Sequence, residues 1–164
     1  MISVIIPTHN PDPSRLRATL QGLRAQSLPA SAWETLLIDN ASERFPDAAF
    51  FADNAPAGLR IVPEPVLGLT AARRCGFAAA QGDMAVLVDD DNVLAPDYLE
   101  QVLAIFRRHP RVGLAGGKSL PRFDVAPARW AEEFLPLLAL RDLGEEEKIS
   151  TGLLPAGGAQ RSYP

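Results

Sequence analysis

Three consecutive carboxylates, Asp89-Asp90-Asp91, follow the apolar run 84–88. Clustered negative charges repel one another and resist removal from water, so a buried strand that ends in such a cluster is unusual. A divalent cation supplies the opposite charge, and a site of oxygen ligands alone suits Mg²⁺ or Mn²⁺. The triplet therefore indicates either a metal site or a solvated acidic turn that opens the helix at Pro96.

Three further polar segments lie where strands are expected to end or where a helix is expected to open. They are Pro7–Asn10, Asp39–Ser42 and Gly68–Arg74. Each alone has an ordinary structural explanation, such as shaping a turn, capping a helix or forming a surface ion pair. In an open α/β sheet, however, the carboxyl ends of the strands meet at one edge, where ligands bind. The four segments together therefore predict one polar site.

The chemistry of these segments is complementary. Asp39 can accept an N–H group from the edge of a nucleobase. The planar guanidinium of Arg73 can bind base or phosphate oxygens. A metal ion on the acidic triplet can bridge a pyrophosphate. This set is typical of a metal-dependent site for a nucleoside diphosphate.

The elements that must position these side chains alternate along the chain. Strands are expected at 2–6, 33–38, 59–62, 84–88 and 112–115. Helices are expected from Ser14 as N-cap to about Gln26, within the mixed segment 41–58, at 68–80, at 96–108, and at 128–143 with a bend at Pro136. The alternation predicts an α/β fold with a mostly parallel sheet.

Composition limits the function classes. The chain has 164 residues, 47% of them hydrophobic, which predicts one globular domain or part of one. A net charge of −4 argues against a nucleic-acid partner. The lone cysteine, Cys75, allows no disulfide within the chain and indicates a reducing compartment. No signal peptide and no run of roughly 20 apolar residues is present, so we expect no transmembrane segment and a location in the cytoplasm or at the periphery of a membrane.

Three other classes of site fit less well. A Rossmann dehydrogenase would carry Gly-x-Gly-x-x-Gly after its first strand, and this chain does not. An EF-hand would need glycine where Leu94 stands and a ligand where Val93 stands. A phosphatase with an aspartyl nucleophile would place its acids after the first strand, where this chain has Pro7-Thr8.

With these motifs in view, the sequence resembles the family 2 glycosyltransferases. The motifs that carry the resemblance are Ser3-Val-Ile-Ile-Pro-Thr-His-Asn10, Leu37-Ile-Asp-Asn-Ala-Ser42, Gly68-Leu-Thr-Ala-Ala-Arg73 and Leu87-Val-Asp-Asp-Asp91. They occur in the order seen in that family, and the resemblance covers about the first 120 residues. The resemblance implies the GT-A fold, a Rossmann-like, mostly parallel sheet flanked by helices. It also implies transfer of a sugar, with inversion, from a nucleotide-diphosphate sugar to a hydroxyl acceptor.

The same resemblance implies roles for individual residues. Asp91 would ligate a Mg²⁺ or Mn²⁺ ion that bridges the donor phosphates. The donor would be a UDP-sugar, and the acceptor a saccharide, a lipid-linked molecule or another hydroxyl compound. Arg74 stands where the family often has Asn, which leaves the nucleotide preference open. The implied donor-binding residues are Pro7, Thr8, Asn10, Asp39, Asn40, Arg73, Asp89 and Asp90.

The resemblance divides the chain into a nucleotide-sugar-binding half, 1–120, and the start of an acceptor-binding half, 121–164, which we expect to be incomplete. It identifies no catalytic base, because Asp124, Glu132 and Glu133 have ordinary solvent-facing explanations. The alternative is therefore a non-catalytic nucleotide-sugar-binding remnant that lacks only the base. We also expect exposed apolar surface near Leu153 and Leu154, and hence self-association.

Overall fold

The computed structural model describes residues 1–123, 125–137, 142, 144 and 149. It divides into two compact units, Met1–Gly113 and Leu114–Pro164. All four polar segments belong to the first unit. In the described residues, no helix combines the length and the apolar character needed to cross a membrane.

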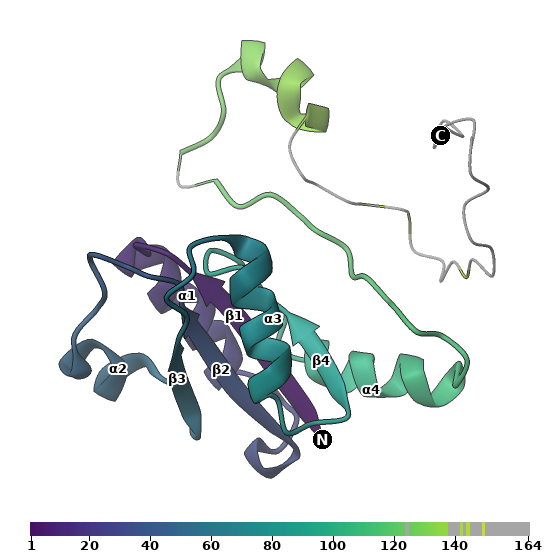
Figure 1. Cartoon of the computed structure of the whole chain (residues 1–164). Coiled ribbons are helices and arrows are strands. Elements are labelled where there is room, and N and C mark those ends of the chain that lie inside the picture. The colour runs from purple at the N-terminus through teal and green to yellow at the C-terminus, as the bar shows by residue number, and fades with distance from the viewer. Residues whose placement is uncertain (124, 138–141, 143, 145–148, 150–164) are drawn as a thin grey trace, which may run out of the picture. The chain divides into compact units, whose positions relative to one another are not determined.

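The first unit is built on a four-stranded parallel sheet in the order β3-β2-β1-β4 (Figure 1). The register places Ile2 of β1 between Trp33 and Met84, and Ile5 between Leu36 and Leu87. Because every strand runs the same way, all four carboxyl ends lie at one edge of the sheet. This confirms the parallel α/β architecture expected from the alternation of elements. The strands are β1 (Ile2–Thr8), β2 (Trp33–Asp39), β3 (Leu59–Pro63) and β4 (Met84–Leu87).

Helices cover both faces of the sheet. On one face, α1 (Pro13–Arg24), α2 (Ala48–Asn54) and α4 (Tyr98–Arg108) share a buried core with β1, β2 and β4. On the other face, α3 (Leu69–Ala79) packs on Ile5, Leu36 and Ile38. All seven residues of β1 are buried, as expected of a central parallel strand covered on both faces.

Helix α1 begins two residues earlier than its sequence suggests. Asp12, rather than Ser14, is the N-cap: its Oδ1 accepts hydrogen bonds from the backbone N–H groups of Ser14 at 2.8 Å and Arg15 at 3.0 Å. Pro13 occupies the first helical position, where its missing N–H costs nothing. The expectation of Ser14 as cap was therefore wrong by two residues.

The second unit contains one described helix, the 3₁₀ helix η2 (Arg129–Leu137), on which Trp130 and Phe134 meet edge to face with ring centroids 6.2 Å apart. The predicted helix 128–143 is described no further than Leu137. The side chain of Glu132, together with Asp124, Leu153 and Leu154, lies outside what the structure describes.

The predicted fifth strand, 112–115, was wrong. These residues pair with no strand among those described, and Leu114 is 90% exposed. Glycines at 113, 116 and 117 interrupt the segment, so it has little side chain to bury and a high conformational freedom to lose on pairing.

Candidate functional site

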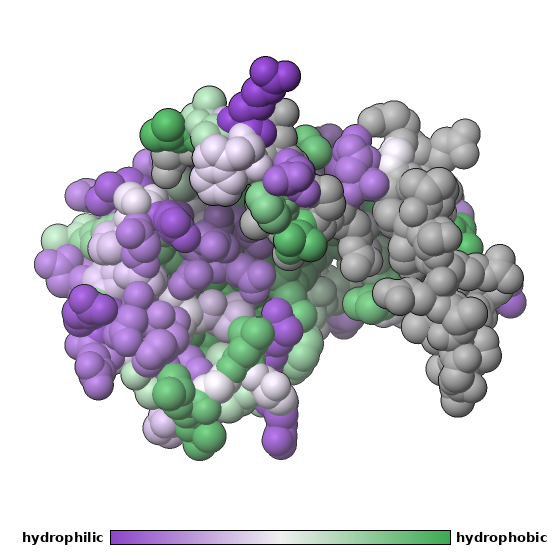
Figure 2. Space-filling model, turned by 90° about the horizontal axis from the view of Figure 1, so that it is seen from above, coloured by the Kyte–Doolittle hydropathy of each residue, from purple (hydrophilic) through white to green (hydrophobic). Residues whose placement is uncertain are grey.

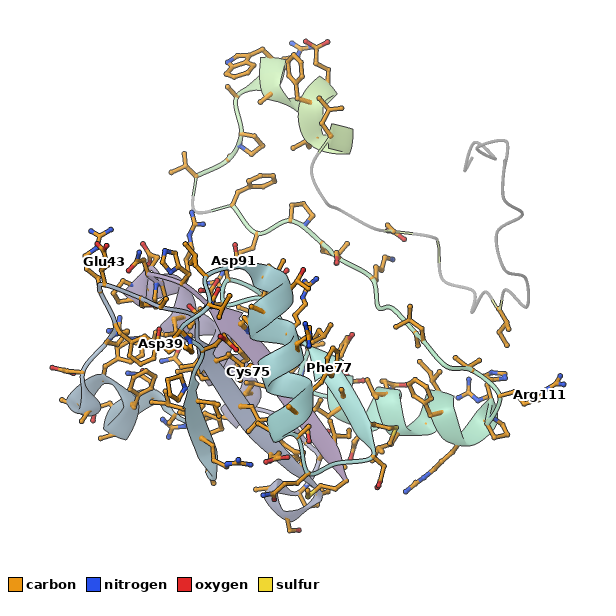
Figure 3. The ribbon with its side chains drawn as sticks, in the orientation of Figure 1. Asp39, Glu43, Cys75, Phe77, Asp91 and Arg111 are labelled. Carbon is orange, nitrogen blue, oxygen red and sulfur yellow. The ribbon has the colours of Figure 1, made fainter. Side chains whose placement is uncertain are left out.

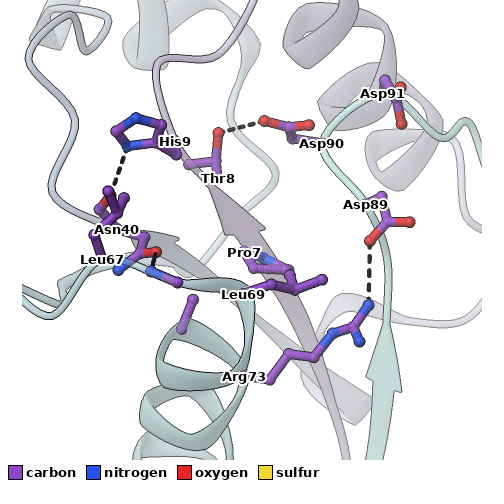
Figure 4. Close-up of a pocket in the computed structure, with 12 residues that line it drawn as sticks. Pro7, Thr8, His9, Asn40, Leu67, Leu69, Arg73, Asp89, Asp90 and Asp91 are labelled. Carbon is purple, nitrogen blue, oxygen red and sulfur yellow. Dashed lines mark hydrogen bonds and ion pairs between the residues drawn. The ribbon is translucent and has the colours of Figure 1, made fainter.

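A pocket of about 540 Å³ opens at the carboxyl edge of the sheet (Figure 4). It is walled by the ends of β1 and β2, by the start of α3 and by the acidic triplet after β4. Figure 2 looks down on this edge, and the part of the face over α1 and α2 is mostly hydrophilic. Seven of the nine predicted site residues line the pocket: Pro7, Thr8, Asn40, Arg73, Asp89, Asp90 and Asp91.

The three carboxylates of the triplet have different surroundings. Asp89 faces the guanidinium of Arg73, with Oδ1 3.7 Å from Nη2. Asp91 faces Arg15 of α1 at 3.9 Å, and its side chain is half exposed. Asp90 instead turns inward and accepts a hydrogen bond from the hydroxyl of Thr8. The outward carboxylates are thus separated by one that points into the protein.

The surroundings of Asp90 raise the pKa of its carboxyl group above the ordinary value. Burial raises its pKa, and the negative charges of Asp91 and Asp89 raise it further, although the hydrogen bond from Thr8 opposes them. Three acids in sequence remain unfavourable when all are ionised. A cation placed beside the triplet would relieve that repulsion.

Arg73 is the cationic group that lines the pocket. It projects from α3, and its Nε is buried without a hydrogen-bond partner in the described part of the chain. Its ion pair with Asp89 is long and leaves the N–H fork available to an anion. An oxyanion such as a phosphate would satisfy these donors.

Asn40 lines the pocket, but its amide is fully engaged with the backbone. Its Nδ2 donates to the carbonyls of Glu64 at 3.1 Å and Val66 at 2.7 Å, and its Oδ1 accepts from the N–H of Gly68 at 2.7 Å. The residue is 3% exposed. Asn40 therefore fixes the loop that leads into α3, and through α3 the position of Arg73.

Asn10 lies outside the pocket and joins two loops. Its Oδ1 accepts from the backbone N–H groups of Glu43 and Arg44, both at 2.9 Å, and its own N–H donates to the hydroxyl of Ser42. Asn10 and Ala41 both adopt left-handed backbone angles, with φ of 48° and 54°. The loops after β1 and β2 thus brace each other beside the pocket.

Asp39 lines a neighbouring hollow of about 300 Å³, with Ala41, Ser42 and the segment 63–65. Its Oδ1 accepts from the N–H of Ser42 at 3.2 Å. Figure 3 places Asp39 and Asp91 at the same edge of the sheet. Asp39 and Arg73 therefore line different hollows, although Asp39, at the end of β2, pairs in register with Thr8 at the end of the adjacent strand β1, which lines the larger pocket.

The pocket offers carboxylate ligands to a metal ion, but the described residues do not supply a complete set of protein ligands. Among the described residues, no three His, Cys, Asp or Glu side chains gather closely enough to hold a metal. Mg²⁺ is often held by one or two carboxylates together with substrate phosphates. The donor set around Asp91 fits that open kind of site.

Several residues that line the pocket are not among the predicted donor-binding residues, because their side chains carry little chemical signal. Leu67, Leu69 and Ala72 contribute apolar surface, and Gly68 has a φ of 141°, a conformation open to glycine. His9, from the segment Pro7–Asn10, also lines the pocket, with Nδ1 2.8 Å from the carbonyl oxygen of Asn40. Only the glycine before a helix was a usable signal.

Comparison with known proteins decides the family. The model of the family described as "Glycosyl transferase family 2" matches residues 3–156. The chain belongs to this family. The match includes all four motifs on which the resemblance rested.

Relatives and solved structures agree with this membership. The chain is 28% identical over 71% of its length to an N-acetylglucosaminyltransferase of Rhizobium meliloti and 31% identical over the same share to one of Rhizobium leguminosarum. Crystal structures of Staphylococcus aureus TarS 1-349 with UDP and with UDP-GlcNAc superpose at TM-scores of 0.58 and 0.57, with 20% identity over 74% of the chain. The similarity to TarS shows that the fold is GT-A-like.

The chain spans only part of each of these proteins. It covers 28% of each rhizobial enzyme and 38% and 37% of the two TarS chains. It also covers 12% of the y4gI protein of Sinorhizobium fredii, to which it is 32% identical.

Proposed function

We propose that this chain binds the nucleotide-sugar donor of a glycosyltransferase that transfers a sugar from a UDP-sugar to a hydroxyl acceptor with inversion. The observation that carries the proposal is the convergence of Arg73 and the acidic triplet on one pocket at the carboxyl edge of the sheet. Family membership supports sugar transfer. The UDP and UDP-GlcNAc bound by the TarS structures support the choice of donor.

The two hollows suit the two ends of a nucleoside diphosphate. The diphosphate belongs in the larger pocket, where Arg73 offers a planar fork of N–H donors. The base belongs in the smaller one, where the carboxylate of Asp39 can accept an N–H group. Asn40 lies between Asp39 and Ala41 in sequence, so one short segment borders both hollows.

The protein groups would act on charge that develops during transfer. As the bond from the anomeric carbon to the diphosphate breaks, negative charge grows on the departing oxygens. Arg73, fixed on α3, stabilises that charge without having to reorganise. Asp91 would hold Mg²⁺ or Mn²⁺, which when bound supplies further positive charge to the donor phosphates.

The competing function is nucleotide-sugar binding without transfer. One observation favours it: apart from the triplet, no carboxylate in the described residues lines the larger pocket. Inverting transfer needs a base within hydrogen-bond reach of the acceptor hydroxyl. The two functions share every donor-binding residue and differ in that base.

Calorimetry with UDP, GDP, ADP and CMP tests the binding proposal. Each nucleotide is titrated with Mn²⁺ present and again with excess chelator. We expect UDP to bind only with the metal, because the ionised triplet repels a bare diphosphate. Equal affinity for UDP in both conditions would contradict the proposal.

A second assay separates transfer from binding alone. Labelled UDP-sugars are incubated with the chain and a panel of saccharide, lipid-linked and other hydroxyl acceptors. Multiple-turnover transfer supports the enzyme. Metal-dependent UDP binding without transfer supports the binding module.

A further inference from the structure

The acidic triplet lies in a turn that is held from outside by two buried hydroxyl groups. The turn itself is closed by the N–H of Asn92, which donates to the carbonyl of Asp89 at 3.0 Å. The hydroxyl of Thr8, at the end of β1, donates to the side chain of Asp90. The hydroxyl of Thr19, on α1, donates to the backbone carbonyl of the same Asp90 at 3.0 Å. Residue 90 is therefore tied to two different elements.

This arrangement sets the directions of the neighbouring acids. With Asp90 fixed inward, the side chains of Asp89 and Asp91 remain 57% and 50% exposed and turn to different cations, Arg73 and Arg15. A rotation of the turn would move both at once. The geometry of the predicted metal ligand thus depends on what holds Asp90.

We infer that Thr19 is a positioning residue of the donor site, acting through its hydrogen bond to the carbonyl of Asp90. The inference rests on the proposed function, because it assigns Thr19 a role in metal-dependent donor binding. Thr19 lines neither hollow and has no direct access to the donor. Mutation of a residue that orients a metal ligand from behind typically lowers metal affinity or activity by roughly 10–100-fold.

The hydroxyl, rather than the bulk of the side chain, makes the connection. Thr19 is 1% exposed, and besides Asp90 its hydroxyl has the carbonyl of Arg15 at 3.3 Å, one turn earlier on the same helix. Valine has nearly the same shape but cannot donate, whereas serine keeps the donor. Thr19→Val and Thr19→Ser therefore separate the hydrogen bond from the packing.

Thr35 on β2 offers a matched control. It is also fully buried, but its hydroxyl has no hydrogen-bond partner among the described residues. Thr35→Val makes the same chemical change in the core without removing such a bond. Any effect common to both valine variants belongs to the substitution and not to the turn.

The test measures two properties in each variant. Calorimetry gives the affinity for UDP in the presence of Mn²⁺. NMR gives the rate of amide hydrogen exchange at Asn92 without any ligand, with the buried amides of Leu36 and Leu37 as references for global stability. We expect Thr19→Val to weaken Mn²⁺-dependent UDP binding by about tenfold and to speed exchange at Asn92 several-fold beyond any change at the references. Thr19→Ser and Thr35→Val should match the parent chain in both.

The outcomes distinguish this inference from the proposed function. If the parent chain does not bind UDP with Mn²⁺, the proposed function fails, and the exchange measurement alone decides whether Thr19 holds the turn. If the parent binds and Thr19→Val binds equally well, the positioning role is overturned, whatever the exchange rate. Weaker binding with unchanged exchange at Asn92 would also overturn it, because the effect would then not pass through the turn.

Discussion

Gly76 of α3 lies so close to Ile5 of β1 that a methyl group on Gly76 would come within 2.3 Å of Ile5 Cγ2. No two carbon atoms that are not bonded can approach so closely. The missing side chain therefore sets the distance between α3 and the central strand. Arg73 lies about one turn earlier on the same helix, so this contact also sets how far its guanidinium reaches into the pocket.

Gly76→Ala should lower the free energy of unfolding by about 2 kcal/mol, because the helix must move away from a well-packed sheet. The same movement should weaken UDP binding, since it carries Arg73 with it. Urea denaturation and calorimetry measure the two effects. Gly113→Ala is the control, because nothing lies within 4 Å of the methyl group it would add. Equal stability of the two variants would contradict the packing argument.

Asp91→Ala should remove the metal dependence of UDP binding while leaving the fold intact. The side chain is half exposed and lies beyond the buried part of β4. In a complete enzyme we expect a loss in rate on the order of 10²–10³, as when one preorganised electrostatic group is removed. Calorimetry with Mn²⁺ and with chelator gives the first result, and circular dichroism checks the fold.

Asp39→Ala should instead weaken the discrimination between UDP and other nucleotides and keep the metal dependence. Asp39 lines the smaller hollow and is absent from the lining of the larger one. It is therefore the matched partner of Asp91→Ala in the same titrations. If both variants bound all four nucleotides as the parent does, the placement of base and diphosphate would be wrong.

Ala41→Gly should stabilise the protein by roughly 0.5–1 kcal/mol. A left-handed backbone destabilises the folded state of an alanine by about 1–2 kcal/mol. Glycine removes this cost, but its greater freedom in the unfolded chain reduces the gain in stability by about 0.5–1 kcal/mol. Ala25→Gly is the control, because Ala25 is also exposed but has an ordinary φ of −85°. Thermal unfolding should show a gain for the first and a small loss for the second. A loss in both would mean that the loop relaxes the strain elsewhere.

Glu34→Gln should destabilise the protein by about 2 kcal/mol at pH 7, because three hydrogen bonds to a carboxylate are weakened. The side chain of Glu34 accepts from Ser3 Oγ at 2.7 Å, from the N–H of Gln81 at 2.7 Å and from Arg60 Nη1 at 2.9 Å. Burial acts to raise the pKa of Glu34, but these donors outweigh it and hold the pKa below the ordinary 4.5.

The pH dependence has a definite sign. A carboxylate with a lowered pKa in the folded state contributes its full stability above pH 4.5, and this is lost as the pH falls through the folded-state value. The difference in the free energy of unfolding between the parent and Glu34→Gln, measured by urea titration, should therefore become smaller below pH 4.5. Glu43→Gln, at an exposed position, should have the same free energy of unfolding as the parent across this pH range. If the difference in free energy of unfolding between the parent and Glu34→Gln grew in acid, Glu34 would not be held ionised in the folded state.

Local signals in the sequence were sufficient for the sheet and for the edge at which ligands bind. The apolar runs before Pro7, Asp39 and Asp89 have the length and composition of parallel strands, and their order places the polar ends together. The prediction of a fifth strand failed because a short apolar run forms a strand only if another part of the chain packs against it. Nothing local to residues 112–115 shows whether that partner exists.

The different roles of neighbouring residues in the site could not be predicted from the sequence. Asn40 and Asp39 are neighbours with similar side chains, yet Asn40 binds backbone groups up to 28 residues away, whereas Asp39 opens into a separate hollow. Asp90 looks equivalent to Asp89 and Asp91 until its contact with Thr8 is known. Such differences arise from partners distant in the chain, and a motif does not contain them.

The strand order has a consequence for folding during synthesis. Strand β1 is central, but its neighbour β4 is separated from β3 by residues 64–83. At roughly 5–20 residues per second, a ribosome needs about one to four seconds to make that interval. During that time the edge of β1 that later pairs with β4 has no partner in the nascent chain, although β1, β2 and β3 can already associate. A slow stretch of codons there would prolong the exposure of that edge, and a fast one would shorten the time in which another chain could pair with it.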